Sequence, residues 1–314
     1  MAKYDYATTS PNAMADFNGT MNYIPTLYAG KLLIKFYESS VLGEITNTDY
    51  EGLIRDQGDT VIIRSVPTLT ISDHSKGMTL SNEKPASVST MLEINKGKYW
   101  SFVTDDVDAK QTDVKNFVEE WTKDAAYQLR NVIEQSVLQS IGDDCHAGNT
   151  GATAGVQSGS YDLGEAGAAV TLSKGTVIDT LIDCGTVLDE QNLPDEGRFF
   201  LVPPAICGLI KKSDLADASI SGDSTSIARN GKIGMIDRFT VFKTGNLQQE
   251  VPTTDGGAWT CLFGTKVATT FATQLIKNKV LDNPDGFGML HRGLQVFGFK
   301  VVKPEALGVL YANI

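Results

Sequence analysis

Residues 99–141 read YWSFVTDDVDAKQTDVKNFVEEWTKDAAYQLRNVIEQSVLQSI and predict the longest helix of the chain. Apolar residues recur every three or four positions from Asp113, a suitable N-cap, to Ile141, which precedes Gly142. At about 1.5 Å per residue, the helix would be on the order of 43 Å long. A single apolar stripe on so long a helix indicates that it lies across a sheet. The stripe consists of Val114, Phe117, Val118, Trp121, Ala125, Leu129, Val132, Ile133, Val137 and Ile141.

Before this helix, two segments alternate between apolar and polar residues as strands do. They run from Asp59 to Ile71 and from Val88 to Phe102, and the polar stretch SDHSKGMTLSNEKP lies between them. Such strands form a ribbon that projects from its domain, and Pro67 favours an edge or a kink. An isolated two-stranded ribbon is at most marginally stable in water, so we expect this one to lie on another subunit.

The N-terminal residues 1–25 are polar, contain Pro11 and Pro25, and predict an extended arm with one helical turn. From Thr26 to about Ser39 the spacing of apolar residues predicts an amphipathic helix. Residues 142–170 are rich in Gly, Ala, Ser and Thr, and predict a flexible surface segment between two lobes.

The remaining sequence mixes helices and strands without regular βαβ units, which indicates an α+β fold. In its last part, GLQVFGFKVVKPEALGVLYANI, a change of strand parity beside Gly298 predicts a β-bulge. The predicted elements are a helix at Ser173–Gln191, a strand at Arg198–Pro204, a helix at Ala205–Lys212, a polar loop at 213–230, and strands at Phe239–Lys243, Trp259–Phe263 and Val309–Tyr311.

The composition is that of a globular protein, with 41% hydrophobic and 21% charged residues among 314. Cysteines at 145, 184, 207 and 261 form no CxxC pair and indicate thiols in a reducing compartment. The polar N-terminus is no signal peptide, and 18 apolar residues never occur in a row. A formal charge of −11 argues against a protein whose main task is gripping nucleic acid, because phosphate binding needs a basic surplus.

Catalytic motifs are missing from the sequence. There is no Walker A loop, GxSxG or HExxH, and His74, His146 and His291 lie far apart. Cys145 precedes His146 in a Gly-rich loop, which does not make a nucleophile–base pair. The aspartates at 105–108 lack EF-hand spacing, so a turn and the N-terminal dipole of the long helix explain them better than a cation. We therefore predict no catalytic residue, cofactor or metal, and no enzyme.

The order of these elements resembles the major capsid proteins of tailed bacteriophages, which have the HK97 fold, and in particular their podovirus-like coat protein branch. The resemblance spans nearly the whole chain in element order. It rests on the ribbon followed by YWSFVTDDVDAKQTD and a helix ending NVIEQSVLQSI, on RFFLVPPAICGLIKKSDL followed by IARNGKIGMIDRFTVFKTGNL, and on GLQVFGFKVVKPEAL near the end.

The resemblance implies a division of the chain into the parts of an HK97-type subunit. We expect an N-terminal arm at 1–25, an N-terminal helix region at 26–58 and an E-loop ribbon at 59–102. We also expect a peripheral domain at 103–171 and 291–314 with a spine helix at 113–141, and an axial domain at 172–290. The candidate assembly contacts are Pro67, Leu69, Ile71, His74, Lys76, Met78, Glu83, Lys84, Met91, Asp217, Ser221, Asp223 and Arg229.

The resemblance also implies hexamers and pentamers of this chain in an icosahedral virion shell, assembled in the cytoplasm of the host bacterium. A separate scaffolding protein is expected, because the chain starts at methionine without a long charged segment. Portal and decoration proteins are further expected partners. Packaged double-stranded DNA would make weak, non-specific contacts with an acidic, mildly repulsive lining. No residue pair is marked for covalent cross-linking, and no membrane contact is expected.

Other interpretations stay open at this point, among them a tail or decoration protein, which the long helix disfavours. An encapsulin-like nanocompartment would share the fold and hold an enzyme instead of a genome. An α+β enzyme or ligand-binding protein would assemble its site from distant residues, and would remain a small particle in gel filtration.

Overall fold

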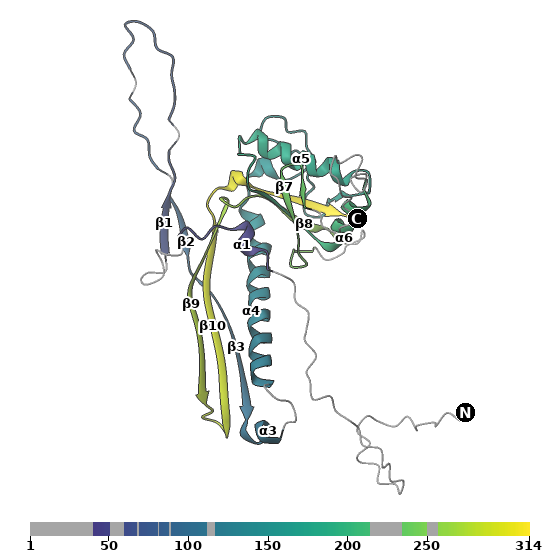
Figure 1. Ribbon diagram of the computed structural model, residues 1–314. Coiled ribbons are helices and arrows are strands. Elements are labelled where there is room, and N and C mark those ends of the chain that lie inside the picture. The colour runs from purple at the N-terminus through teal and green to yellow at the C-terminus, as the bar shows by residue number, and fades with distance from the viewer. Residues whose placement is uncertain are drawn as a thin grey trace, which may run out of the picture.

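The computed structural model describes residues 40–50, 60–67, 69–80, 82–87, 89–111, 117–213, 234–249 and 257–314. These residues form a mixed α+β structure with one long helix, a long three-stranded sheet, a six-stranded sheet and a two-stranded hairpin (Figure 1). The predicted α+β class is confirmed. The predicted arm at 1–25, the predicted helix at 26–39 and the polar loop from residue 214 onward lie outside the described residues.

The six-stranded sheet has the strand order β4-β11-β8-β5-β7-β6. All five residues of β5 are buried, because helices cover both of its faces. Phe200 and Val202 point to α5 and α6, whereas Phe199 and Leu201 point to the C-terminal end of α4. The elements of this part are β4 (Val170–Thr171), α5 (Val177–Glu190), β5 (Arg198–Val202), α6 (Pro204–Lys212), β6 (Met235–Ile236), β7 (Phe239–Lys243), β8 (Trp259–Thr265) and β11 (Leu307–Asn313).

The long sheet has the order β3-β10-β9, and α4 runs beside it (Figure 1). Its strands are β3 (Lys96–Asp105), β9 (Thr269–Asp282) and β10 (Gly288–Val301). The short helix α3 (Asp106–Gln111) follows β3 at one end of the sheet, and α4 spans Phe117–Ile141. α4 ends at Ile141 as predicted. The predicted stripe is fully buried only from Ile133 onward, since Trp121 and Val132 each expose 44% of their surface.

The predicted bulge is present, but it lies in the neighbouring strand. Val296 pairs with Leu275 and Phe297 pairs with Thr273, so the extra residue is Gln274 of β9. Gly298 serves a different purpose, because a Cβ atom there would lie 2.2 Å from the carbonyl oxygen of Glu93. The glycine therefore lets the base of the hairpin approach β10 closely.

The predicted ribbon is shorter than expected. Its strands are β1 (Thr60–Arg64) and β2 (Ser89–Glu93), which pair antiparallel, and the described residues from Ser65 to Ser87 form no strand. The predicted strand from Val88 to Phe102 is in fact two strands, because β2 pairs with β1 whereas β3 pairs with β10. Ile63, Leu92, Ile94 and Ala272 form the small core that seats the hairpin on the long sheet.

Strand pairing also divides the chain differently from the expected domain boundary at 290/291. β9, expected in the axial domain, pairs with β10, and β11, expected in the peripheral domain, pairs with β8. The segment 142–170 is not a free surface excursion either. Ala154 and Leu163 are completely buried, because they pack into the core below α5.

The remaining elements are short helices, and the first of them is joined to β9 by main-chain hydrogen bonds of the residue Asn47. Asn47 follows α1 (Leu42–Ile45), and it donates its main-chain N–H to Thr269 and accepts one from Phe271. The 3-10 helices lie at Gly142–Asp144, Ala147–Asn149 and Pro304–Ala306.

Candidate assembly surfaces

The projecting loop, residues 65–87 between β1 and β2, extends away from the rest of the chain (Figure 1). Its apolar side chains have no core of their own, since Val66 is 93% exposed and Ile71 is 96% exposed. A hydrogen bond spans the loop, from the Thr70 main-chain N–H to Oε2 of Glu83 at 3.1 Å. Such a bond leaves the apolar side chains in water, where each would favour burial by about 1.5–3 kcal/mol.

The predicted contact residues divide into two groups. Eight of them are exposed on or beside the projecting loop, and Pro67 is half-buried at its base; the eight are Leu69, Ile71, His74, Lys76, Met78, Glu83, Lys84 and Met91. The others, Asp217, Ser221, Asp223 and Arg229, lie outside the described residues. The role of either group in contacts between subunits stays a prediction.

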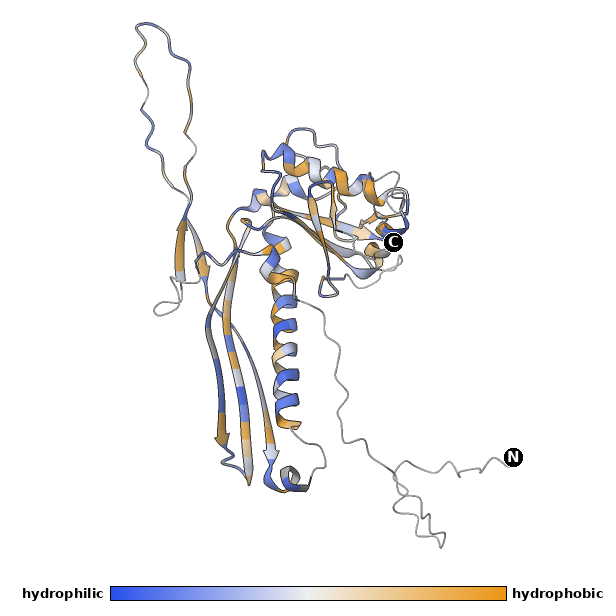
Figure 2. Ribbon diagram, in the orientation of Figure 1, coloured by the Kyte–Doolittle hydropathy of each residue, from blue (hydrophilic) through white to orange (hydrophobic). Residues whose placement is uncertain are grey.

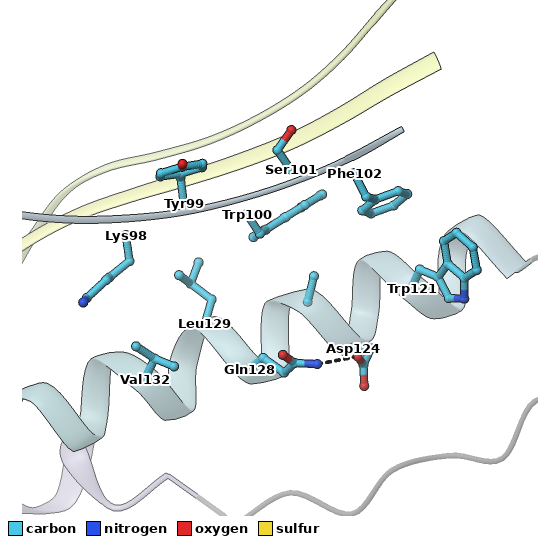
Figure 3. A pocket seen from close by; sticks show the side chains of 11 residues that line it. Lys98, Tyr99, Trp100, Ser101, Phe102, Trp121, Asp124, Gln128, Leu129 and Val132 are labelled. Atoms are coloured by element: carbon cyan, nitrogen blue, oxygen red, sulfur yellow. Dashed lines mark hydrogen bonds between the residues drawn. The ribbon is translucent and has the colours of Figure 1, made fainter. Parts of the chain in front are cut away.

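A second surface is the groove between β3 and α4, with a volume of about 410 Å³ (Figure 3). Trp100, Phe102 and Trp121 line it, and Phe102 meets Trp121 edge-on with 5.7 Å between ring centroids. Two of its polar side chains pair with each other, because Nε2 of Gln128 donates to Oδ2 of Asp124 at 2.6 Å. The groove presents aromatic surface for packing and holds no paired acid and base.

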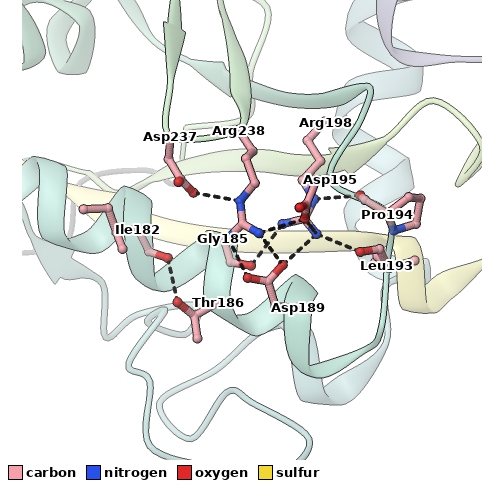
Figure 4. A network of polar contacts seen from close by, with 10 residues as sticks. All are labelled: Ile182, Gly185, Thr186, Asp189, Leu193, Pro194, Asp195, Arg198, Asp237 and Arg238. Atoms are coloured by element: carbon pink, nitrogen blue, oxygen red, sulfur yellow. Dashed lines mark hydrogen bonds and ion pairs between the residues drawn. The ribbon is translucent and has the colours of Figure 1, made fainter. Parts of the chain in front are cut away.

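Arg198 is buried at the centre of a polar network that joins α5 to β5 and to the β6–β7 turn (Figure 4). Its guanidinium donates to Oδ1 of Asp189 at 2.7 Å and to the carbonyl oxygens of Gly185, Leu193 and Pro194. Burial acts to raise the pKa of Asp189, but hydrogen bonds from Arg238 and Arg198 outweigh it and lower that pKa. The network is satisfied within the chain, so its role is to hold these elements together.

Glu134 of α4 is also buried, and it ties two distant segments to the helix. Oε2 accepts the main-chain N–H of Val41 at 3.0 Å, and Oε1 accepts from Nδ2 of Asn246 at 3.1 Å and from Oγ1 of Thr244 at 3.4 Å. The sequence carries no local signal for this contact, since Val41 and the 244–246 segment are both far from Glu134 in the sequence.

The three histidines are in different surroundings. Nδ1 of His146 accepts the main-chain N–H of Gly148 at 3.1 Å, His291 stacks on Phe102 at 4.9 Å, and His74 is exposed on the projecting loop. Among the described residues, no three His, Cys, Asp or Glu side chains are grouped so that they could hold a metal ion. Within the same residues, none of the helices is long and apolar enough to cross a membrane.

The surroundings of Cys145 and Asp105 indicate structural roles for both residues. Burial, the largest cause, raises the pKa of the Cys145 thiol to about 11, so little thiolate is present at neutral pH. Oδ1 of Asp105 accepts the main-chain N–H of Val107 at 2.8 Å. The acidic turn therefore starts α3 and not, as predicted, the long helix.

The sequence did not reveal the surface formed by β9 and its neighbours, because β9 was not predicted at all. The end of β9, the β9–β10 turn and the start of β10 expose Val280, Leu281, Phe287 and Met289. The middle of β9 carries no apolar–polar alternation that would predict a strand, since Lys277, Asn278 and Lys279 are consecutive polar residues.

Solved structures of phage capsids have the same fold as this chain. A structure from Mycobacterium phage Che8 covers 92% of this chain and 97% of its own, with a TM-score of 0.75 and 23% identity. The capsid structure of cyanophage P-SCSP1u covers 98% and 99%, with a TM-score of 0.69 and 15% identity. The mature capsid of bacteriophage PhiM1 covers 98% and 97%, with a TM-score of 0.66 and 14% identity. No curated protein matched.

These similarities show the HK97-type fold that was predicted. The family described as phage capsid protein matches residues 88–311, which is most of the chain. The chain belongs to this family of phage capsid proteins. It is a structural component of a virion shell built from copies of itself, and not an enzyme. The podovirus-like branch stays a prediction.

Proposed function

We propose that this chain forms hexamers and pentamers that tile an icosahedral shell around double-stranded DNA, and that assembly takes place in the cytoplasm of the host bacterium. The observation that carries the proposal is the projecting loop, whose apolar side chains have no partner among the described residues. Ile71 is 96% exposed, and contact of its apolar side chain with water is unfavourable in free energy. Packing against a neighbouring subunit would remove this side chain from water.

The two large sheets would belong to different domains of the subunit in the shell. In this proposal α4 with the β3-β10-β9 sheet forms the peripheral domain, and the six-stranded sheet with α5 and α6 forms the axial domain. The arm at 1–25 and the E-loop hairpin would overlap neighbouring subunits. Asp217, Ser221, Asp223 and Arg229 would lie near the axis of each capsomer.

In this proposal the other partners are a separate scaffolding protein, a portal and decoration proteins. DNA would touch the shell weakly, since the formal charge of −11 disfavours tight binding to phosphates. The proposal requires no cofactor.

Substitution of the projecting loop tests the proposal. The double variant Leu69→Asp/Ile71→Asp should fold as the wild type does and yet form no shells, because these side chains are already in water in the free subunit. The control Leu69→Met/Ile71→Val keeps both positions apolar and should assemble. Electron microscopy and sedimentation measure shell formation, and circular dichroism measures folding.

Two results would contradict the proposal. One is a wild-type chain that stays a monomer or dimer with its scaffolding protein at high concentration. The other is shells from a phage infection that contain an enzyme and no nuclease-protected genome, as an encapsulin-like compartment would.

A further inference from the structure

Three cations lie side by side on one face of the long sheet. Lys279 of β9 is directly opposite Arg292 of β10, and Lys277 follows two residues along on the same face. All three side chains are exposed. Phe102 and His291 point to the other face, where Phe102 contacts Trp121 of α4, so the cations lie on the face away from the helix.

This cationic face, defined by Lys277, Lys279 and Arg292, has no counterion in the described part of the chain, where none of the three forms an ion pair. Like charges directly opposite each other on neighbouring strands are destabilising. An anionic partner would therefore stabilise the face.

The cations have an apolar and aromatic border. Tyr99 of β3 is 78% exposed and Leu294, its partner on β10, is 36% exposed. Val103 and Leu281, in the next row of the same face, are 48% and 44% exposed. Figure 2 shows hydrophilic residues between hydrophobic ones along these strands. Aromatic, arginine and aliphatic side chains together are typical of a surface that binds protein.

One end of the same sheet carries negative charges, which complement the positive charges of the cationic face. The acidic tip, defined as residues 105–107 and 282–289, exposes Asp105, Asp106, Asp282 and Asp285. It also exposes apolar side chains, with Phe287 at 88%, Val107 at 55% and Met289 at 48%. Asp282 is three residues from Lys279, or roughly 10 Å along an extended strand, which is too far for an ion pair within the chain.

We infer that the acidic tip of one copy binds the cationic face of a second copy. The tip supplies carboxylates for the three cations, and Phe287 and Met289 cover the border of Tyr99 and Leu294. Nucleic acid would satisfy the cations but would leave these apolar side chains in water. The inference deepens the proposed function, on which it rests, by naming one contact between subunits.

Charge reversal on each surface tests this contact. Lys277→Glu/Lys279→Glu changes the face by −4, and Asp282→Lys/Asp285→Lys changes the tip by +4. Because like charges then meet, each double variant should lower the yield of shells by about tenfold or more. The quadruple variant has the net charge of the wild type and should recover most of the yield. Lys174→Glu/Lys303→Glu, at two exposed lysines elsewhere, is the matched control and should assemble.

A mixture of the two double variants provides a second measurement if the quadruple variant does not fold. The reversed face of one chain can then meet the reversed tip of the other, so the mixture should form more shells than either variant forms alone. Assembly that is insensitive to reversal of the face, or reversals that rescue each other in neither experiment, would overturn the inference. Reversal of the face that reduces only the DNA retained in shells would also overturn it, in favour of nucleic acid. In all these outcomes, wild-type shells keep the proposed function intact.

Discussion

Replacement of Glu134 by glutamine should loosen the attachment of residues 40–46 to α4. In the wild type, Oε2 accepts the main-chain N–H of Val41 at 3.0 Å, while Oε1 accepts from Asn246 at 3.1 Å. A glutamine can keep an oxygen toward Asn246, but its NH₂ group then faces the N–H of Val41. A buried donor left without an acceptor costs about 1–3 kcal/mol, and the charge-assisted bond is lost as well.

Hydrogen exchange measures this effect at the site itself. A loss of about 1–3 kcal/mol corresponds to exchange of the Val41 amide that is roughly 5–150 times faster. Glu134→Ala should have at least as large an effect, since it also leaves a cavity in the core of Val41, Ile133 and Val137. Gln135→Ala, at the exposed next position, should change stability by less than about 0.5 kcal/mol. Unchanged protection of Val41 in Glu134→Gln would refute the reasoning.

Four further predictions concern single residues. Arg198→Met should destabilise the subunit by about 3–5 kcal/mol, measured by denaturant unfolding, because it leaves the carbonyl oxygens of Gly185 and Leu193 without their donor and removes one of the two arginines that pair with Asp189. The pKa of Asp189 is below its ordinary value of 3.8, so its contribution to stability is present above that pH and is lost as the pH falls through the lowered pKa; acid unfolding of Asp189→Asn should lack this component. Gly298→Val should lower the melting temperature and displace the hairpin, at a cost of about 1–3 kcal/mol; Gly97→Ala, whose Cβ would meet nothing closer than 3.9 Å, is the control. Cys145 should react slowly with a thiol reagent at pH 7 and faster up to its pKa of about 11, and a rate at pH 7 equal to that of free cysteine would contradict this.

Local patterns predicted the elements that are buried in a regular way. β5 stands out as a continuous apolar run, and Ile141 followed by Gly142 marks the end of α4. β9 was missed because it lies at the edge of its sheet: Lys277, Asn278 and Lys279 are all exposed, so its residues show no alternation of burial. Pairing with different partners divides the predicted strand 88–102, and no local pattern reports on that.

The candidate surfaces were predictable to a similar extent. The exposure of the projecting loop followed from its polar sequence and its length. The partners of Glu134 and Arg198 were not predictable, because a hydrogen bond between residues 41 and 134 depends on the fold and leaves no mark at either position.

The junction of β2 and β3 has a mechanical consequence. The projecting loop continues through β2 and Ile94 directly into β3, which runs in the opposite direction from the loop (Figure 1). A pull on the loop therefore acts along the axis of β3, and it loads the hydrogen bonds between β3 and β10 in shear. Ten residues of β3, from Lys96 to Asp105, are paired with β10, so the force is shared along the ladder instead of opening its bonds one at a time. The projecting loop is therefore anchored to the subunit along the whole length of β3.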